Sequence, residues 1–368
     1  MHYVTDFFIA IITTYLAFTN SLALGIDSWI SPEPETPTVI IDESAETETI
    51  LSSLPSIIGQ VIPDILLRSA DYQQAALSSA TGLTGASTND PLEAIVNIFC
   101  TFTTPEYIRT TTGTGFFIDP DGVIMTNAHV AQFLLMEETD EFGETECIVR
   151  SGNPAAPQYH AELLYLPPAW IQENATVMNA AVPMGTGERD YALLYVSRNI
   201  DNTPLPAQFP ALSFNSKLLP LSTKNNSVVA AGYPADDLLA NGPFADLIPQ
   251  RADTSVSELY TFGSNYADVF SVRGSVVGAE GASGGPVVNT DGEVIGMIVT
   301  RGDDATDGVG SLRAITLSHV ERTIAEETGF TLAENLSGNL PYRATIFAET
   351  LTPFLLTILQ QGQTNSSL

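Results

Sequence analysis

Apolar residues recur in short runs along the middle of the chain, and polar turn residues separate the runs. Ala94–Phe102 is rich in Val, Ile and Phe and predicts a strand. Gly115–Ile118 and Val123–Thr126 flank Asp119-Pro120-Asp121-Gly122 and predict a hairpin. Many short strands between turn clusters favour an all-β sandwich or barrel over an alternating α/β sheet. Further strands are expected at 148–150, 160–166, 191–196, 228–232, 269–272, 286–288 and 294–300.

The last part of the chain changes to a helical pattern. Ser318-His319-Val320-Glu321 matches a helix-starting capping box, and Gly329 follows as a stop signal. We expect a C-terminal tail at 331–368 with an apolar helix, because Ala344–Leu359 is apolar apart from a few polar residues. A docking helix, an oligomer contact and an interfacial segment all fit this pattern, and the oligomeric state stays open.

The N-terminus carries a separate apolar run. Phe7–Phe18 has the length of a signal-peptide core, and the run extends to Leu24, just long enough for a thin membrane span. No lysine or arginine precedes Arg68, so the usual basic flank is missing. We predict that 1–26 is a signal peptide or an N-terminal membrane anchor. Either form implies export to the cell envelope, the periplasm or the exterior, and an anchor would also associate the protein with a membrane. The other interpretation of this segment is an ordinary buried helix.

Residues 27–90 have the composition of an acidic linker with short helices. The stretch 31–48 contains three prolines and six acidic residues without a single base, which favours an extended, solvated chain. In 50–67, apolar residues recur at three- and four-residue steps and predict short helices. We therefore expect the main domain to begin near residue 91.

Charge excludes one class of partner. The chain has 43 acidic and 13 basic residues, a net charge of −30. Binding to nucleic acid requires clustered Lys and Arg to neutralise phosphates, so we expect no nucleic-acid partner. An acidic, self-repelling and soluble surface is the simplest interpretation of this charge.

Two cysteines are present, Cys100 and Cys147, without a CxxC pair. A zinc site of the usual spacing is therefore excluded, and we expect neither a metal nor another cofactor. The two cysteines form either a disulfide or two buried thiols, depending on the compartment. A bridge would close a loop of roughly 50 residues and stabilise the fold by about 4 kcal/mol.

The candidate chemistry centres on Ser283, within Gly281-Ala282-Ser283-Gly284-Gly285-Pro286. A serine hydroxyl needs a base to accept its proton, an acid to orient the base, and N–H donors for the oxyanion. The candidate base is His129, just after the predicted hairpin. The candidate acid is Asp190, which opens an apolar strand where a buried carboxylate needs a partner.

The Gly-x-Ser-x-Gly pattern also fits the nucleophile elbow of α/β-hydrolase esterases. That fold requires a helix directly after the serine, with the acid and the histidine downstream. Here Pro286-Val287-Val288 and a turn follow, which predicts a hairpin. The esterase alternative would use His319 with Asp303, Asp304 or Asp307.

The order His129, Asp190, Ser283, with its flanking residues, resembles trypsin-like serine proteases of the chymotrypsin fold. It is most similar to the HtrA/Deg-type bacterial branch. The matching stretches are spread over residues 113–316. They are Gly113-Thr114-Gly115-Phe116-Phe117-Ile118, Thr126-Asn127-Ala128-His129, Asp190-Tyr191-Ala192-Leu193-Leu194, Gly232-Tyr233-Pro234, Gly281–Pro286 and Gly292-Glu293-Val294-Ile295-Gly296.

The resemblance implies two six-stranded antiparallel β-barrels with short flanking helices. The protease domain would span 91–330, with barrel 1 at about 91–205 and barrel 2 at about 206–330. The resemblance also implies that His129, Asp190 and Ser283 form a catalytic triad, with the N–H groups of Gly281 and Ser283 as the oxyanion hole. The function it implies is a serine endopeptidase that forms an acyl-enzyme on polypeptide substrates, in processing or quality control of exported proteins.

Some positions depart from the family or concern the substrate. Ala282 stands where the trypsin branch has an aspartate, so we expect no zymogen activation of that kind, and too few residues follow the closing helix for a PDZ domain. By analogy, Val277 falls near the floor of the primary pocket. The strand Met297, Ile298, Val299 and Thr300 would pair with the substrate backbone. A catalytically silent binding module on the same fold is the alternative function.

Overall fold

The computed structural model describes most of the chain from residue 87 onwards. The described ranges are 87–103, 108–139, 143–175, 187–236, 245–263, 265–302 and 310–366. The predicted signal peptide or anchor at 1–26 and nearly all of the linker at 27–90 lie outside these ranges. Their assignments, and the domain boundaries we draw, stay predictions.

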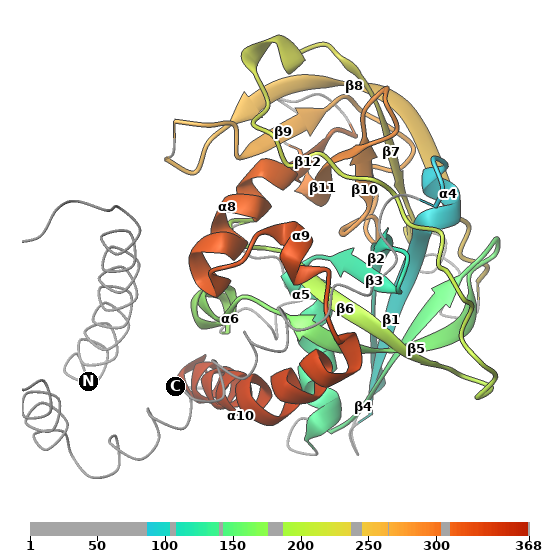
Figure 1. The fold of residues 1–368 in the computed structure, drawn as a ribbon, viewed down its shortest axis with the longest axis vertical. Helices are drawn as coiled ribbons and strands as arrows, with labels where there is room; N and C mark the ends of the chain where they lie inside the picture. Colours follow the sequence, from blue (N-terminus) through green and yellow to red (C-terminus); the bar gives the residue numbers. More distant parts are fainter. Residues whose placement is uncertain are drawn as a thin grey trace, which may run out of the picture. The chain divides into compact units, whose positions relative to one another are not determined.

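Two closed, six-stranded antiparallel barrels dominate the described part of the chain (Figure 1). The first has the hydrogen-bonded order β1-β2-β3-β6-β5-β4, and the second has β7-β8-β9-β12-β11-β10, so both barrels repeat one topology. This is the chymotrypsin-like, all-β architecture, and the predicted fold class is confirmed. The first barrel consists of β1 Ile95–Thr103, β2 Ile108–Asp119, β3 Val123–Thr126, β4 Glu144–Ser151, β5 Ala156–Tyr165 and β6 Ala192–Asn199. The second consists of β7 Ser227–Gly232, β8 Gln250–Tyr260, β9 Val269–Val272, β10 Pro286–Val288, β11 Val294–Arg301 and β12 Leu312–Thr316.

Each strand predicted from an apolar run overlaps an observed strand, but β8 and β12 were not predicted. Most residues of β8 are half-buried or exposed, so no apolar run marks it. Pairing with β7 and β9 holds this strand in place instead. Strand β8 is therefore stabilised by its two neighbouring strands in the barrel, which a local sequence pattern does not reveal.

Both predicted hairpin turns are present. Gly122 has a φ of +94°, and its N–H donates to the carbonyl of Asp119. Gly292 has a φ of +83° and donates to Asn289 in the same way. Glycine accepts this left-handed backbone without steric cost, which explains why it closes both turns.

Short helices flank the barrels, and one predicted helix start is wrong. The N-cap of α8 is Thr316, whose Oγ1 accepts from the N–H of His319, whereas Ser318 already lies in the first turn. Thr316 is the last residue of β12 and has the extended backbone that a capping residue needs. Gly329, at a φ of +79°, ends the helix as predicted. The helices are α4 Pro91–Ala94, α5 Ala128–Ala131, α6 Pro168–Asn174, α8 Leu317–Thr328, α9 Leu332–Asn335 and α10 Leu340–Ser366, with 3₁₀ helices η1 Gln132–Glu138 and η3 Leu221–Thr223.

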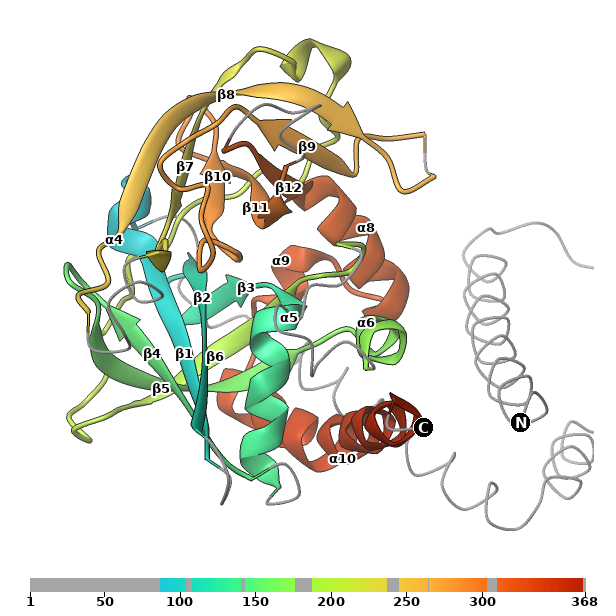
Figure 2. The ribbon, with the colours of Figure 1, turned by 180° about the vertical axis from the view of Figure 1, so that it is seen from behind.

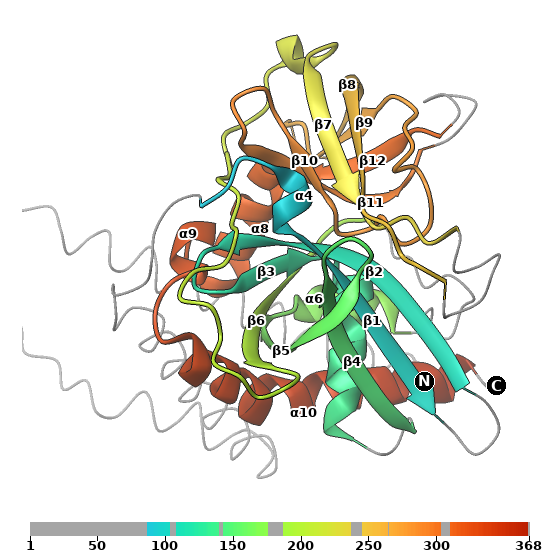
Figure 3. The same cartoon turned by 90° about the vertical axis from the view of Figure 1, so that its right-hand side faces the viewer.

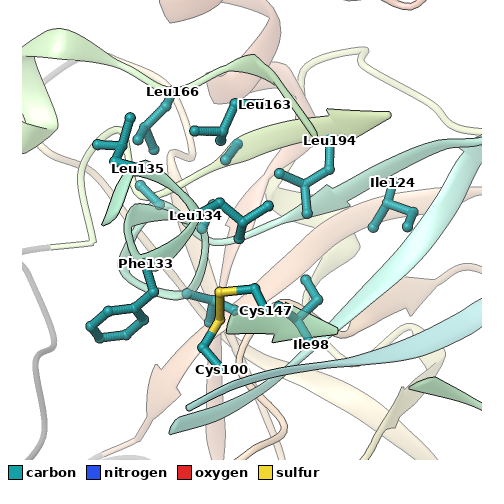
Figure 4. Close-up of a cluster of buried hydrophobic side chains, with 14 of the residues drawn as sticks. Ile98, Cys100, Ile124, Phe133, Leu134, Leu135, Cys147, Leu163, Leu166 and Leu194 are labelled. Atoms are coloured by element: carbon teal, nitrogen blue, oxygen red, sulfur yellow. A yellow bond between two sulfur atoms is a disulfide. The ribbon is translucent and has the colours of Figure 1, made fainter. Parts of the chain in front are cut away.

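Cys100 and Cys147 form a disulfide, which decides between the two sequence interpretations. They are paired residues on the neighbouring strands β1 and β4, and both are buried. Figure 4 shows the bridge beside Ile98 and Phe133 in the core of the first barrel. For a sequence separation of 47 between the two cysteines, the chain-entropy model gives about 4 kcal/mol of stabilisation.

The C-terminal segment packs as a docking helix. Helix α10 contacts β5, β6, α6 and η1, and its Leu355 and Leu359 belong to the core of the first barrel (Figure 2). Arg343 is fully buried and donates from Nη1 to the carbonyls of Asn335 and Ser337, at 2.6 and 2.8 Å. This guanidinium therefore satisfies carbonyls at the end of α9 and joins α9 to α10. In the ranges that the structure describes, no helix is both long and apolar enough to cross a bilayer.

Asp119 offers a test of how burial affects stability. Burial raises its pKa from an ordinary value of 3.8 to about 6, with Asp121 adding repulsion, although the N–H of Asp121 donates to it at 2.8 Å. The folded state thus holds this proton more tightly than the unfolded chain. Stability is lost as the pH rises between these two values, and the loss is complete above the folded pKa.

We expect Asp119→Asn to raise the melting temperature at pH 8 and to give no gain at pH 3.5. The amide oxygen keeps the hydrogen bond but carries no charge to desolvate. The measurement is thermal unfolding of both proteins across this pH range. Asp291→Asn, in the corresponding exposed turn of the second barrel, is the matched control. An equal gain at both pH values would contradict the prediction.

Candidate active site

His129 and Asp190 form a buried pair in the first barrel. His129 lies in α5, directly after β3, and Asp190 lies directly before β6, the strand that pairs with β3. The Nδ1 atom of His129 lies 2.7 Å from Oδ2 of Asp190, and the backbone N–H of His129 donates to Oδ1 at 2.9 Å. A carboxylate oxygen can only accept a hydrogen bond, so His129 Nδ1 carries the proton. The other ring nitrogen, Nε2, is then the basic one.

The backbone of Asp190 is also held. Asn127, the N-cap of α5, makes no capping hydrogen bond, and its Nδ2 instead donates to the carbonyl of Asp190 at 2.8 Å. Asp190 is 2% exposed and His129 is 8% exposed. The pair therefore lies in a low-dielectric environment where a hydrogen-bonded carboxylate orients the imidazole strongly.

Ser283 lies in the loop that enters β10 of the second barrel, and β11 supports this loop from one side. The N–H of Gly284 donates to Ile298 O, and the N–H of Ile298 donates to Gly285 O, each at 2.8 Å. The Ser283 hydroxyl donates a long, 3.5 Å hydrogen bond to Val299 O. Within the described residues, no hydrogen bond joins Ser283 and His129; such contacts are often loose without substrate.

The backbone around Ser283 presents two N–H donors. In the part of the chain that the structure describes, the N–H groups of Gly281 and Ser283 donate to no protein acceptor. The carbonyls of these two residues are both engaged, by Thr114. The loop thus has its acceptors satisfied and two donors open, which is the arrangement that an oxyanion needs.

Thr114 of β2 organises this loop from the first barrel. Its N–H donates to Ser283 O and its Oγ1 donates to Gly281 O, both at 2.7 Å. Its Oγ1 also accepts from the N–H of Tyr233, and its carbonyl accepts from Thr126 Oγ1. The sequence pattern Gly113-Thr114-Gly115 gave Thr114 no role, because its partners Gly281, Ser283 and Tyr233 lie more than a hundred residues away along the chain.

Two glycines allow close backbone approaches at this point, Gly284 to β2 of the first barrel and Gly285 to β7 of the second. A Cβ on Gly284 would lie 1.8 Å from Thr114 O, and a Cβ on Gly285 would lie 2.1 Å from Ala231 O. Both distances are far shorter than any real contact, and both opposing atoms are backbone. Gly284 also has a φ of +89°. Glycine is therefore required at both positions.

The predicted substrate-binding residues lie mostly inside the second barrel. Val277 is fully buried against Gly232 and Ala282, in the barrel core. The side chains of Met297, Ile298 and Val299 are buried too, and Ile298 already uses its N–H and carbonyl to hold the Ser283 loop. Val299 is skipped in the pairing of β11 with β12. Its backbone, with that of Thr300, is the part of this strand that we still predict to contact substrate.

The α/β-hydrolase alternative fails on topology. Strand β10, not a helix, follows Ser283. His319 pairs through Nδ1 with Asp268 at 3.1 Å, on another part of the second barrel, and Asp303, Asp304 and Asp307 lie outside the described residues. Across the described ranges, no three His, Cys, Asp or Glu side chains converge as a metal site.

Comparison with known proteins places this geometry in a family. The model of the trypsin-like peptidase domain matches residues 113–297, which is half of the chain and includes the His129, Asp190 and Ser283 positions. The chain belongs to the trypsin-like peptidase domain family. This confirms the resemblance on which the assignment of the two barrels rested.

Individual members of the protease class are similar to this trypsin-like chain. A Do-like protease homologue of Arabidopsis thaliana, Do-like 14, is 29% identical over 198 residues, which cover 54% of this chain and only 37% of that protein. The crystal structure of the active form of the Rv3671c protease from M. tuberculosis has a TM-score of 0.39 and 21% identity, covering 67% of this chain and 91% of that one. The inactive form of the same protease has a TM-score of 0.37 and 22% identity, covering 64% of this chain and 89% of that one.

We expect Gly284→Ala to prevent the nucleophile loop from forming. The new methyl group would displace the backbone of Thr114, whose N–H and Oγ1 hold the carbonyls of Ser283 and Gly281. The measurement is labelling of Ser283 by a fluorophosphonate probe, with circular dichroism to establish that the variant is folded. Gly263→Ala is the control, because Gly263 also has a positive φ, +101°, but no atom lies within 4 Å of its Cβ position. Full labelling of Gly284→Ala would contradict the steric argument.

Proposed function

We propose that this protein is a serine endopeptidase that cleaves polypeptides through an acyl-enzyme. One observation carries the proposal: Thr114 bonds both to the Ser283 loop, with its two open N–H donors, and to Thr126, three residues before His129. Base and nucleophile are thereby tied to one residue. The family and the Do-like relative support a peptidase as the class of enzyme.

The first half of the reaction uses all three side chains. Ser283 Oγ attacks the carbonyl carbon of the scissile peptide bond, and His129 Nε2 accepts the hydroxyl proton. The imidazolium formed is stabilised by Asp190, which accepts from Nδ1–H at 2.7 Å. His129 then donates the proton to the leaving amine, the C–N bond breaks, and the acyl group remains on Ser283.

The second half regenerates the enzyme. A water molecule replaces the amine, His129 accepts its proton, and the hydroxyl oxygen attacks the acyl carbon. The ester bond to Ser283 breaks, and the serine oxygen recovers the proton from His129. In both halves the negative oxygen lies at the N–H groups of Gly281 and Ser283, whose fixed dipoles need no reorganisation.

We expect Ser283→Ala to abolish fluorophosphonate labelling and casein hydrolysis, since loss of a triad serine costs about 10⁶-fold in kcat. Asp190→Asn should lower kcat by about 10⁴-fold, because the imidazole then favours the wrong tautomer. The measurement uses the full chain and compares labelling with casein digestion. Ser227→Ala, at an exposed serine of β7, is the matched control.

The possible outcomes separate the rival functions. Labelling and digestion by the wild type, both lost in Ser283→Ala, would support the endopeptidase. Labelling without digestion would favour an esterase. A folded wild type that neither labels nor digests would favour a catalytically silent binding module.

We also propose export, with a role in processing or quality control of exported proteins. The support is the apolar run Phe7–Phe18, and an exported context suits the Cys100–Cys147 disulfide. The test expresses the full chain, separates soluble, membrane and external fractions, and determines the N-terminal residue by mass spectrometry. Recovery of the intact chain only from the cytosol would contradict export.

A further inference from the structure

Helix α8 holds the residues on both sides of Asp190. Arg189 precedes Asp190, and its Nε lies 2.7 Å from Oε1 of Glu327. Tyr191 follows Asp190, and its hydroxyl lies 2.8 Å from Thr323 Oγ1. Residues four apart lie on one face of a helix. One face of α8 therefore binds both chain neighbours of the candidate catalytic acid.

The backbone at Arg189 indicates that these contacts hold a strained turn. Arg189 has a φ of +56°, a left-handed conformation that is uncommon for any residue other than glycine. The turn begins at Gly187, with a φ of +85°, and the N–H of Asp190 donates to Gly187 O at 3.4 Å. Such a conformation persists where the surroundings over-determine it, and it occurs often at functional sites.

Glu327 is the central residue of this arrangement. Its Oε2 accepts from the Tyr165 hydroxyl while Oε1 faces Arg189. Burial raises the pKa of Glu327, whereas Tyr165 and Arg189 oppose that rise. The Tyr165 ring also stacks on Tyr191, with centroids 6.1 Å apart. A half-buried carboxylate thus makes two specific contacts, each of which leads to the turn at Asp190.

The hydrogen bond to Thr323 has a defined direction. The Thr323 hydroxyl donates to His319 O at 2.9 Å, so its proton is used within the helix. Tyr191 is therefore the donor and Thr323 the acceptor. Both Tyr191 and Thr323 are buried, so no solvent competes for this bond.

We propose that Glu327 is a positioning residue for catalysis, acting through Arg189 to set the orientation of Asp190 toward His129. The proposal rests on the endopeptidase function proposed above. Helix α8 continues directly from β12 of the second barrel (Figure 3), whereas Asp190 lies just before β6 of the first. The ion pair therefore couples the acid of one barrel to the barrel that carries Ser283.

The test compares wild type with Glu327→Gln and Arg189→Gly. The glutamine keeps an acceptor for Tyr165 but loses the charge, and the glycine accepts the left-handed backbone but cannot pair with Glu327. Each variant should lower kcat by about 10- to 100-fold, since small misplacements of catalytic groups have effects of this size. The KM should stay within about twofold, because no substrate contact is removed. The double variant should be no worse than either single one if both changes break the same ion pair.

A second readout does not depend on turnover. We expect the proton between His129 Nδ1 and Asp190 to give a downfield NMR resonance, and this resonance should shift or broaden in Glu327→Gln. The matched control is Glu326→Gln, an exposed glutamate one residue earlier on the same helix, which should leave both kcat and the resonance unchanged.

The outcomes distinguish this proposal from the one on which it rests. Unchanged kcat and an unchanged resonance in Glu327→Gln would overturn the positioning role. So would a lower melting temperature with full turnover of the folded fraction, because the contact would then serve stability alone. If wild type neither labels nor digests casein, the endopeptidase function fails, and the resonance by itself decides whether Glu327 orients Asp190.

Discussion

The contact between Thr114 and the Ser283 loop is the interaction on which the geometry of the site depends. One residue of the first barrel satisfies two carbonyls of a loop in the second, and it also binds the N–H of Tyr233 at the end of β7. These bonds are fully buried, so their loss would leave several backbone groups without partners. Glycine at 284 is a consequence, because its backbone and that of Thr114 meet closer than any side chain allows.

A second connection between the barrels runs in the opposite direction. Thr114 reaches from the first barrel to the nucleophile, while α8 reaches from the second barrel to both neighbours of Asp190. A mixed apolar cluster lies between them and includes Phe116, Tyr191, Val288 and Leu317. Apolar packing brings the barrels together without directional preference, whereas these polar contacts specify their register.

Local patterns predicted what depends on neighbours along the chain. Alternating apolar runs and glycine turns located most strands, including both hairpins closed by Gly122 and Gly292. Strand β8 was not predicted, because its stability comes from pairing on both edges and its side chains are largely half-exposed. The N-cap of α8 is Thr316 and not the predicted Ser318, because the end of β12 decides where the helix begins. The roles of Thr114 and Glu327 were not predicted, because the residues they hold in the site are distant in sequence.

The amino-acid sequence by itself determined the all-β class, the family, and the identities of His129, Asp190 and Ser283 as candidates, because each lies in a short motif of fixed local chemistry. It left the two cysteines undecided between thiols and a bridge, and the tail undecided between three roles. Tertiary structure joins Cys100 to Cys147 through the pairing of β1 with β4, and it packs α10 against the first barrel. It also decided which donors stay open and which residues hold the acid, since these depend on distances between segments far apart along the chain.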